Sequence, residues 1–125
     1  MNKFLLVAIG GAVGSVARFG LGSFVATRLG ARFPYGTFII NVTASFLIGF
    51  LLTVLAEKTA WSPGLLYLLS IGFLGGYSTF STFEYETFRA FQSGEVFIAA
   101  LNVVLSVGIG FAGVWLGYIA GRLAA

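Results

Sequence analysis

Apolar and polar residues divide the chain into four long apolar segments with short polar breaks between them. A helix of about 20 residues crosses the hydrocarbon core of a bilayer, and every segment is long enough to do so. The pattern therefore predicts four transmembrane helices, at about residues 4–27, 35–56, 64–92 and 96–121. Because the breaks are short, residues 1–125 are expected to form a single transmembrane domain of the all-α class.

The third segment departs from a plain apolar helix between residues 72 and 86, which read GFLGGYSTFSTFEYE. Glycine is less favourable than alanine inside a helix by about 1 kcal/mol. In hydrocarbon, non-helical backbone persists only where protein buries it or where it lines a wet cavity. We therefore predict that the third helix is broken in mid-membrane after Gly75 and Gly76 and restarts around residues 78–80. Discontinuous helices of this kind hold ions or substrates in transporters.

Composition supports a membrane protein and excludes most enzyme chemistry. The hydrophobic fraction is 58% and the charged fraction 9%, whereas about 25% of residues are charged in soluble proteins. The chain has no cysteine, histidine or aspartate, so thiolate nucleophiles, imidazole bases and the usual zinc sites are absent. The basic residues lie singly near helix ends, which favours anchoring at lipid headgroups over nucleic-acid binding. We expect no enzyme activity.

Basic residues are balanced between the two sides of the predicted membrane domain. Three lie on each side: Lys3, Lys58 and Arg122 on one, and Arg28, Arg32 and Arg89 on the other. Orientation normally follows a clear excess of lysine and arginine on the cytoplasmic side. Either one helix dominates insertion, or the chain inserts both ways and forms an antiparallel homodimer. Counting alone leaves both alternatives open.

Small residues recur along the first and fourth segments. The first holds Gly10, Gly11, Gly14, Gly20 and Gly22, and the fourth holds a run with glycine at every fourth position from Gly113 to Gly121. Such spacing lets helix backbones approach closely in lipid, where packing drives association. We predict tight helix packing within the chain and between chains.

The second segment carries a small and polar stripe at every fourth position: Thr37, Asn41, Ser45, Gly49 and Thr53. Asn41 is the informative member, because a carboxamide inside a membrane needs a partner. It either links helices, an interaction worth about 0.6–2 kcal/mol, or its two N–H donors meet a passing anion. On the residues alone, the linking role is slightly preferred.

Arg18, in the middle of the first segment, also needs a partner, since a membrane arginine marks a functional site by default. It can bind an anion, pair with a glutamate such as Glu86, or cap carbonyls of the broken helix; a structural pairing role is preferred. On the restarted helix, Thr79, Thr82 and Glu86 are expected on one face beside Phe83. Phe80 lies on its flank, and Ser81 points to the opposite side. Phenylalanine edges and hydroxyl donors together suit a small anion.

Three stretches together resemble one family. Residues 72–83 (GFLGGYSTFSTF), 36–41 (GTFIIN) and 14–18 (GSVAR) closely resemble, in register, the landmarks of the Fluc (CrcB) family of fluoride channels. The resemblance covers essentially the whole chain. It implies a multi-pass protein of the cell (inner) membrane that forms a dual-topology antiparallel homodimer. The dimer would have two pores that passively export F⁻ and give fluoride resistance.

The resemblance also implies site residues, carried over by position. Asn41 would be the pore amide, and Phe80 and Phe83 the paired aromatic rings that face the ion. The polar track beside them would comprise Thr37, Ser81, Thr82, Glu86 and, on the fourth helix, Ser106. The backbone carbonyls of Gly75 and Ser78 would hold a structural Na⁺ at the centre of the dimer. The expected partners are fluoride, a second copy of the chain and the lipid bilayer, without nucleic acid.

Two other functions are weighed against a fluoride channel. A small dual-topology multidrug or cation exporter also has four helices, but it needs a membrane carboxylate early in the first helix. Here the first helix has Arg18 and no acidic residue. A non-transporting membrane subunit would leave Asn41 and the doubled Ser-Thr-Phe triplet without a role. Measurement of fluoride efflux separates these alternatives.

Overall fold

The computed structural model describes residues 2–57 and 63–124, and all its regular elements are helices. Four helical spans are long and apolar enough to cross a membrane, as predicted: Lys3–Leu29 (α1), Tyr35–Glu57 (α2), Pro63–Gln92 and Val96–Ala124 (α6). The third span consists of α3 (Pro63–Leu65), a π-helix η1 (Leu66–Leu74), α4 (Gly75–Tyr77) and α5 (Phe80–Gln92). Lys58, which entered the count of basic residues, lies outside the described residues.

Local signals fix where the helices end. The Asn2 side chain caps α1 by accepting a hydrogen bond of 2.7 Å from the Phe4 N–H. Gly30 ends α1 with a φ of 80°, and Gly94 turns the chain between α5 and α6 with a φ of 87°. These left-handed conformations suit glycine because it has no Cβ to collide with the backbone. Both short turns follow from these residues.

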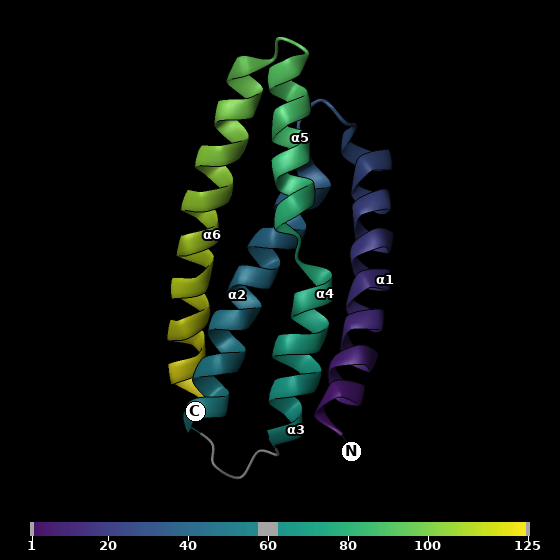
Figure 1. Ribbon diagram of the computed structural model, residues 1–125. Coiled ribbons are helices and arrows are strands. Elements are labelled where there is room, and N and C mark those ends of the chain that lie inside the picture. The colour runs from purple at the N-terminus through teal and green to yellow at the C-terminus, as the bar shows by residue number, and fades with distance from the viewer. Residues whose placement is uncertain (1, 58–62, 125) are drawn as a thin grey trace.

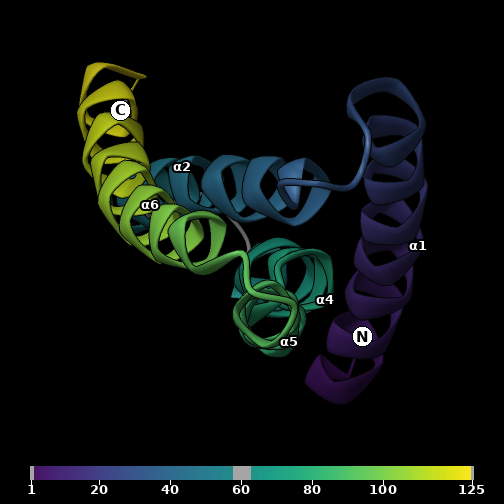
Figure 2. The ribbon, with the colours of Figure 1, turned by 90° about the horizontal axis from the view of Figure 1, so that it is seen from above.

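The helices form a bundle in which α1 and α6 lie on the outside, with α2 and the third span between them (Figure 2). Both termini lie at one end of the bundle, and the α1–α2 and α5–α6 connections lie at the other (Figure 1). The predicted sides therefore hold for the described residues: Lys3 and Arg122 belong to one end, and Arg28, Arg32 and Arg89 to the other.

The third span changes neighbours along its length. Its first part, η1 and α4, packs against α1, whereas its last part, α5, packs against α6. Figure 1 shows the sideways step between α4 and α5 that produces this exchange. The step divides the span into two pieces that are held by different partners.

Glycines make the closest helix contacts. A Cβ added at Gly10 or Gly14 of α1 would overlap the backbone carbonyl oxygens of Leu68 and Phe73, respectively. In the same way, a Cβ at Gly117 of α6 would overlap the carbonyl oxygen of Phe46 on α2. Backbone atoms cannot rotate away from such a clash, so these positions require glycine. The predicted close packing of small residues is confirmed within the chain.

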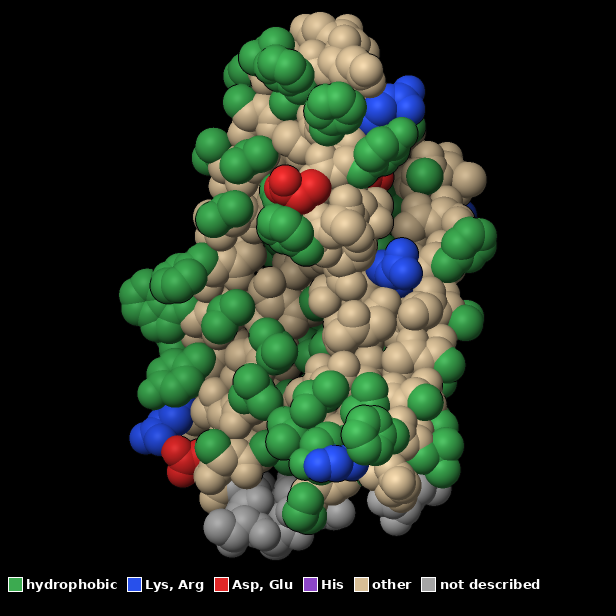
Figure 3. Space-filling model, viewed as in Figure 1, with side chains coloured by type: hydrophobic (Ala, Val, Ile, Leu, Met, Phe, Trp, Pro, Cys, Tyr) green, Lys and Arg blue, Asp and Glu red, His purple; other side chains and the backbone are tan. Residues whose placement is uncertain are grey.

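Large apolar side chains cover the outside of the bundle. Phe4, Phe97, Phe111 and Leu123 are each more than 70% exposed, and a buried cluster of Ile40, Ala44, Leu74 and Tyr77 joins α2 to the third span. On the face in Figure 3, hydrophobic side chains outnumber the charged ones. An outer surface of this kind fits lipid as the surrounding medium.

Candidate functional site

The interruption of the third span lies at Ser78 and Thr79. Ser78 has a ψ of 157° and Thr79 has φ −151° and ψ 116°, both extended conformations between α4 and α5. Gly75 and Gly76 are helical, with φ −64° and ψ −36° at Gly75. The chain therefore leaves the helix just after the two glycines, which stay helical in spite of their low helix propensity. Gly76 is needed for another reason, since a Cβ there would come within 2.5 Å of the Gly11 carbonyl oxygen.

Side chains that bond to the backbone explain why the helix stops there. The Ser78 hydroxyl donates to the Leu74 carbonyl at 2.8 Å. The Thr79 hydroxyl accepts from the Thr82 N–H at 3.3 Å and so caps α5, while it donates to the Thr82 hydroxyl at 3.0 Å. Serine and threonine compete with helical hydrogen bonds in this way. Thr79 is therefore the N-cap of α5, and Thr82 is its hydrogen-bond partner. Thr79 does not lie on the helical face that was expected for it.

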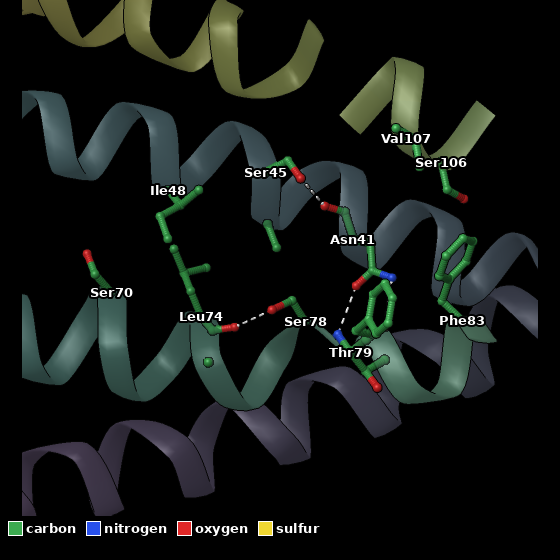
Figure 4. Close-up of a pocket in the computed structure, with 13 residues that line it drawn as sticks. Asn41, Ser45, Ile48, Ser70, Leu74, Ser78, Thr79, Phe83, Ser106 and Val107 are labelled. Carbon is green, nitrogen blue, oxygen red and sulfur yellow. Dashed lines mark hydrogen bonds between the residues drawn. The ribbon is translucent and has the colours of Figure 1, made fainter. Parts of the chain in front are cut away.

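Asn41 of α2 holds the extended backbone of Thr79 from the side. Its Nδ2 donates to the Thr79 carbonyl at 2.9 Å, and its Oδ1 accepts from the Thr79 N–H at 2.8 Å (Figure 4). The carboxamide thus replaces the helical partners that Thr79 has lost. One N–H of Asn41 remains beyond this pair, because a carboxamide carries two. The linking role is confirmed, and one donor is left for a second role.

Two further contacts fix α4 next to the break. The Arg18 Nε donates to the Gly76 carbonyl at 3.1 Å, so Arg18 caps the end of α4. The Thr43 and Tyr77 hydroxyls share a hydrogen bond of 2.8 Å. Among the described residues the ion pairs are Arg32–Glu95 and Arg122–Glu57, so the pairing of Arg18 with Glu86 is not found. A guanidinium at the carbonyl end of a helix is favoured by the helix dipole.

A cavity of about 360 Å³, called here the central cavity, lies beside the break. Its walls bring together six of the predicted site residues: Asn41, Gly75, Ser78, Phe80, Phe83 and Ser106. The Phe80 and Phe83 rings are 5.8 Å apart between centroids, and their planes are inclined by 55°. Phe80 is 73% exposed whereas Phe83 is buried. Two aromatic rings and a carboxamide therefore line the same cavity, and Figure 4 shows Asn41 and Phe83 beside the break.

Thr37 and Glu86 lie in a different cavity. This end cavity has a volume of about 520 Å³ and is formed by the α1–α2 connection and the second half of α5. The Thr37 and Glu86 side chains interact there, and Glu86 Oε1 is buried without a partner among the described residues. Arg32 and Arg89 also line it. From the sequence, these two arginines were considered only in the count of basic residues on each side of the membrane.

The stripe on α2 does not keep a single face. Asn41 and Ser45 line the central cavity, and Thr37 lines the end cavity. Gly49 instead packs against the Val114 carbonyl of α6, and Thr53 bonds back to Gly49 at 2.7 Å. Four residues exceed one helical turn by about 40°, so the row drifts around the helix. The drift carries its last members from the third span to α6.

The remaining predicted residue, Ser81, is exposed on α5 and lines neither cavity. Two residues of the central cavity region had not been expected. The Ser70 hydroxyl is buried without a partner in the described part of the chain and faces this cavity. Asn102, on α6, is 2% exposed and bonds to Ser106 at 3.1 Å. The polarity of Asn102 in an apolar segment was the signal that could have identified it, as it did for Asn41.

Comparison with known proteins places this geometry in context. Residues 5–118 match the family model described as CrcB-like protein, Camphor Resistance (CrcB). The chain is 51% identical over 120 residues, 96% of each chain, to the Fluoride-specific ion channel FluC of Acidobacterium capsulatum. It is 47% identical over 120 residues to the protein of the same name in Solibacter usitatus, with 96% of this chain and 98% of the relative covered. The relative of that name in Geobacter sulfurreducens is 46% identical over 122 residues, 98% of each chain.

Proposed function

This chain belongs to the CrcB family, and we propose from this premise that it is a fluoride-specific ion channel that exports F⁻ passively across the cell membrane. The observation that carries the proposal is the identity of about half with channels of that name along nearly the whole chain. The four spans make it a multi-pass protein of the cell (inner) membrane. It is an ion channel and not an enzyme.

The path of the ion is proposed to run along α5 from the end cavity to the central cavity. Thr37 lies one helical turn from Asn41 on α2, and Glu86 lies about one turn from Phe83 on α5, so the two cavities follow each other along the same helices. At the end cavity Arg32 is paired with Glu95, and Glu86 also lines the wall, so Arg89 is the arginine there without an ion pair among the described residues. Its positive charge is proposed to attract anions. Ser81 and Thr82 extend this proposed polar track on α5.

The chemistry of the central cavity suits fluoride. A small anion loses strongly held water only where donors replace it, and Asn41, whose second N–H is not used in its bonds to Thr79, lines the cavity. The positive edges of Phe80 and Phe83 add weak attraction for an anion. The break at Ser78 and Thr79 is proposed to lie in mid-membrane, since it divides a span that is long enough to cross the bilayer.

The channel is proposed to be an antiparallel homodimer with two pores. Phe80 is 73% exposed although it lines the central cavity, so this wall is open in a single copy. A second copy would close it and exclude lipid from the path. The equal number of basic residues on the two sides of the chain favours insertion in both orientations. The Ser70 hydroxyl, which has no partner within residues 2–57 and 63–124, faces the same cavity.

A structural Na⁺ at the centre of such a dimer fits the residues present. The Thr79 N–H, which in a continuous helix would bond to the Gly75 carbonyl, bonds to Asn41 instead. The Gly75 carbonyl thus loses its helical donor, and the extended backbone of Ser78 turns its carbonyl out of the helical direction. Unwound carbonyls of this kind coordinate Na⁺. The carbonyls of Gly75 and Ser78 from both copies would hold the ion. Its positive charge would offset the negative carbonyl ends of their helices.

Flux from liposomes tests the proposed function. The purified protein, reconstituted into vesicles loaded with potassium fluoride or potassium chloride, is expected to release F⁻ rapidly and Cl⁻ barely, measured with ion-selective electrodes. Empty vesicles are the control. Equal release of both anions, or release of neither, contradicts the proposal, and uptake of an organic cation driven by a proton gradient would favour the exporter.

Sodium dependence tests the proposed cation site separately. The purified protein is expected to unfold at a higher temperature in sodium chloride than in the same concentration of N-methyl-glucamine chloride, because an ion that binds only the folded state stabilises it. Ser78→Ala should keep this difference, since the expected ligand is a backbone carbonyl. Identical melting temperatures in the two salts would argue against a bound Na⁺.

A further inference from the structure

Asn102 is a buried carboxamide in the first third of α6, a largely apolar helix. It is 2% exposed, and it lies where α6 meets α5. A polar side chain in this position is costly unless its groups are hydrogen-bonded. Its partners therefore decide what the residue does.

The hydrogen bonds around Asn102 run in a fixed direction. The Thr87 hydroxyl donates its only proton to the Phe83 carbonyl at 2.8 Å, so its oxygen accepts the bond of 2.9 Å from Asn102 Nδ2. On the other side, the Ser106 hydroxyl donates to Asn102 Oδ1 at 3.1 Å. The network thus joins the backbone of Phe83 on α5 to the side chain of Ser106 on α6. Both ends of the network line the central cavity.

The position of Thr87 on α5 gives the network a geometric consequence. α5 is held at its first turn through the bonds of Asn41 to Thr79. About two turns later it is held again, to α2 through the contact of Glu86 with Thr37 and to α6 through Thr87. Phe83 lies between these two points and is buried. A helix fixed at one point can still turn about its axis, whereas two separated points prevent rotation. The outward-facing Tyr85, Phe88 and Phe91 supply no comparable contact, since all three are exposed.

We infer that Asn102 is a positioning residue of the fluoride path: together with Thr87 it fixes the rotation of α5, and with it the place of the Phe83 ring, while it sets the direction of the Ser106 hydroxyl. This inference rests on the proposed function. It assigns Asn102 an indirect role, because Phe83 and Ser106 line the central cavity and Asn102 acts through them.

Variants at Thr87 test the link with little change in volume. Thr87→Val removes the hydroxyl and is expected to lower the F⁻ flux from liposomes about tenfold, because a buried hydrogen bond is lost and its partner is left unpaired. Thr87→Ser keeps the hydroxyl and should keep most of the flux. Asn102→Leu should lower the flux as Thr87→Val does, and the double variant should add little, because both break the same link. Thr53→Val is the matched control, since the Thr53 hydroxyl also bonds back to a helical carbonyl.

The outcomes separate this inference from the proposed function. The inference is overturned if the F⁻ flux of Thr87→Val equals that of the Thr53→Val control. It is also overturned if Thr87→Ser lowers the flux as much as Thr87→Val does. If Asn102→Leu does not fold, the two Thr87 variants decide. If the unaltered protein carries no fluoride, the proposed function fails, and amide hydrogen exchange still tests the positioning: Thr87→Val should speed exchange over residues 80–92 relative to α2, and Thr87→Ser should not. Equal exchange in these two variants overturns it.

Discussion

Asn41→Asp is expected to abolish fluoride conduction. The carboxylate has no proton for the Thr79 carbonyl, so one of the two bonds that hold the break is lost and two oxygens face each other. The substitution also places a negative charge beside the proposed path of an anion. An acidic side chain at the centre of a membrane helix costs about 2.5–3.5 kcal/mol, and a similar penalty for the passing anion would lower the flux about 60- to 300-fold. Fluoride release from liposomes measures the effect.

The matched control is Asn2→Asp. Asn2 caps α1 at the exposed start of the chain, and aspartate caps helices as well as asparagine does. This variant should conduct fluoride like the unaltered protein. Size-exclusion chromatography shows whether Asn41→Asp keeps its assembly state. A folded Asn41→Asp protein with unimpaired flux would remove Asn41 from the pathway.

Gly14→Ala is expected to destabilise the protein more than any exposed substitution on α1. The added Cβ would overlap the Phe73 carbonyl oxygen and come within 3.0 Å of the Tyr77 nitrogen. Both are backbone atoms, so α1 as a whole must move away from η1 and α4. Overpacking of this kind costs about 1–3 kcal/mol. The same movement stretches the bond from Arg18 to Gly76, which lies one turn further along α1. Melting temperature in detergent and fluoride flux should both fall.

Gly20→Ala provides the opposite result on the same helix. Apart from the backbone of its own helix, no described part of the chain lies within 4 Å of a Cβ at Gly20, and replacing a helical glycine by alanine favours the helix by about 1 kcal/mol. The melting temperature should therefore rise or stay unchanged. If Gly14→Ala and Gly20→Ala had the same effect, close contact between α1 and the third span would not be a source of stability.

The features that the sequence alone predicted are those set by local composition. Spans follow from the length of apolar segments, and close helix contacts follow from glycines spaced by four. Both features can be predicted because lipid solvates apolar side chains but offers no hydrogen-bond partners to the backbone. The family itself was identifiable because three separate motifs coincided in register. The chemistry of the carboxamide alone had left two roles open for Asn41, a link between helices and a donor to an anion.

The break illustrates what local reasoning missed. Low helix propensity pointed to Gly75 and Gly76, but packing decides there: Gly76 stays helical and lets α4 lie against Gly11. The extended residues are Ser78 and Thr79, whose backbone is held by Asn41, 38 positions earlier in the chain. A contact between residues so far apart in sequence is not visible in propensities. Thr37 and Glu86 lie in a different cavity from Asn41, and this too depends on contacts between residues far apart in the sequence.

Asn102 was missed for a simpler reason. It was judged by its apolar surroundings, although the rule that drew attention to Asn41 applies to any carboxamide within a span. Its partner Thr87 lies on another helix, and the link to Phe83 becomes visible only once α5 and α6 are placed side by side. The orientation of the two copies in the membrane stays a prediction, since it concerns an assembly of two chains.

The exchange of neighbours along the third span has a consequence for biosynthesis. η1 and α4 can settle on α1 while the ribosome is still at work, because α1 has already been made. α5, which carries the two glutamates and the arginine of this span, packs on α6, which is made after it. The second half of the span therefore waits for a helix that follows it in the nascent chain. The two halves of one span are thus expected to settle at different times during synthesis.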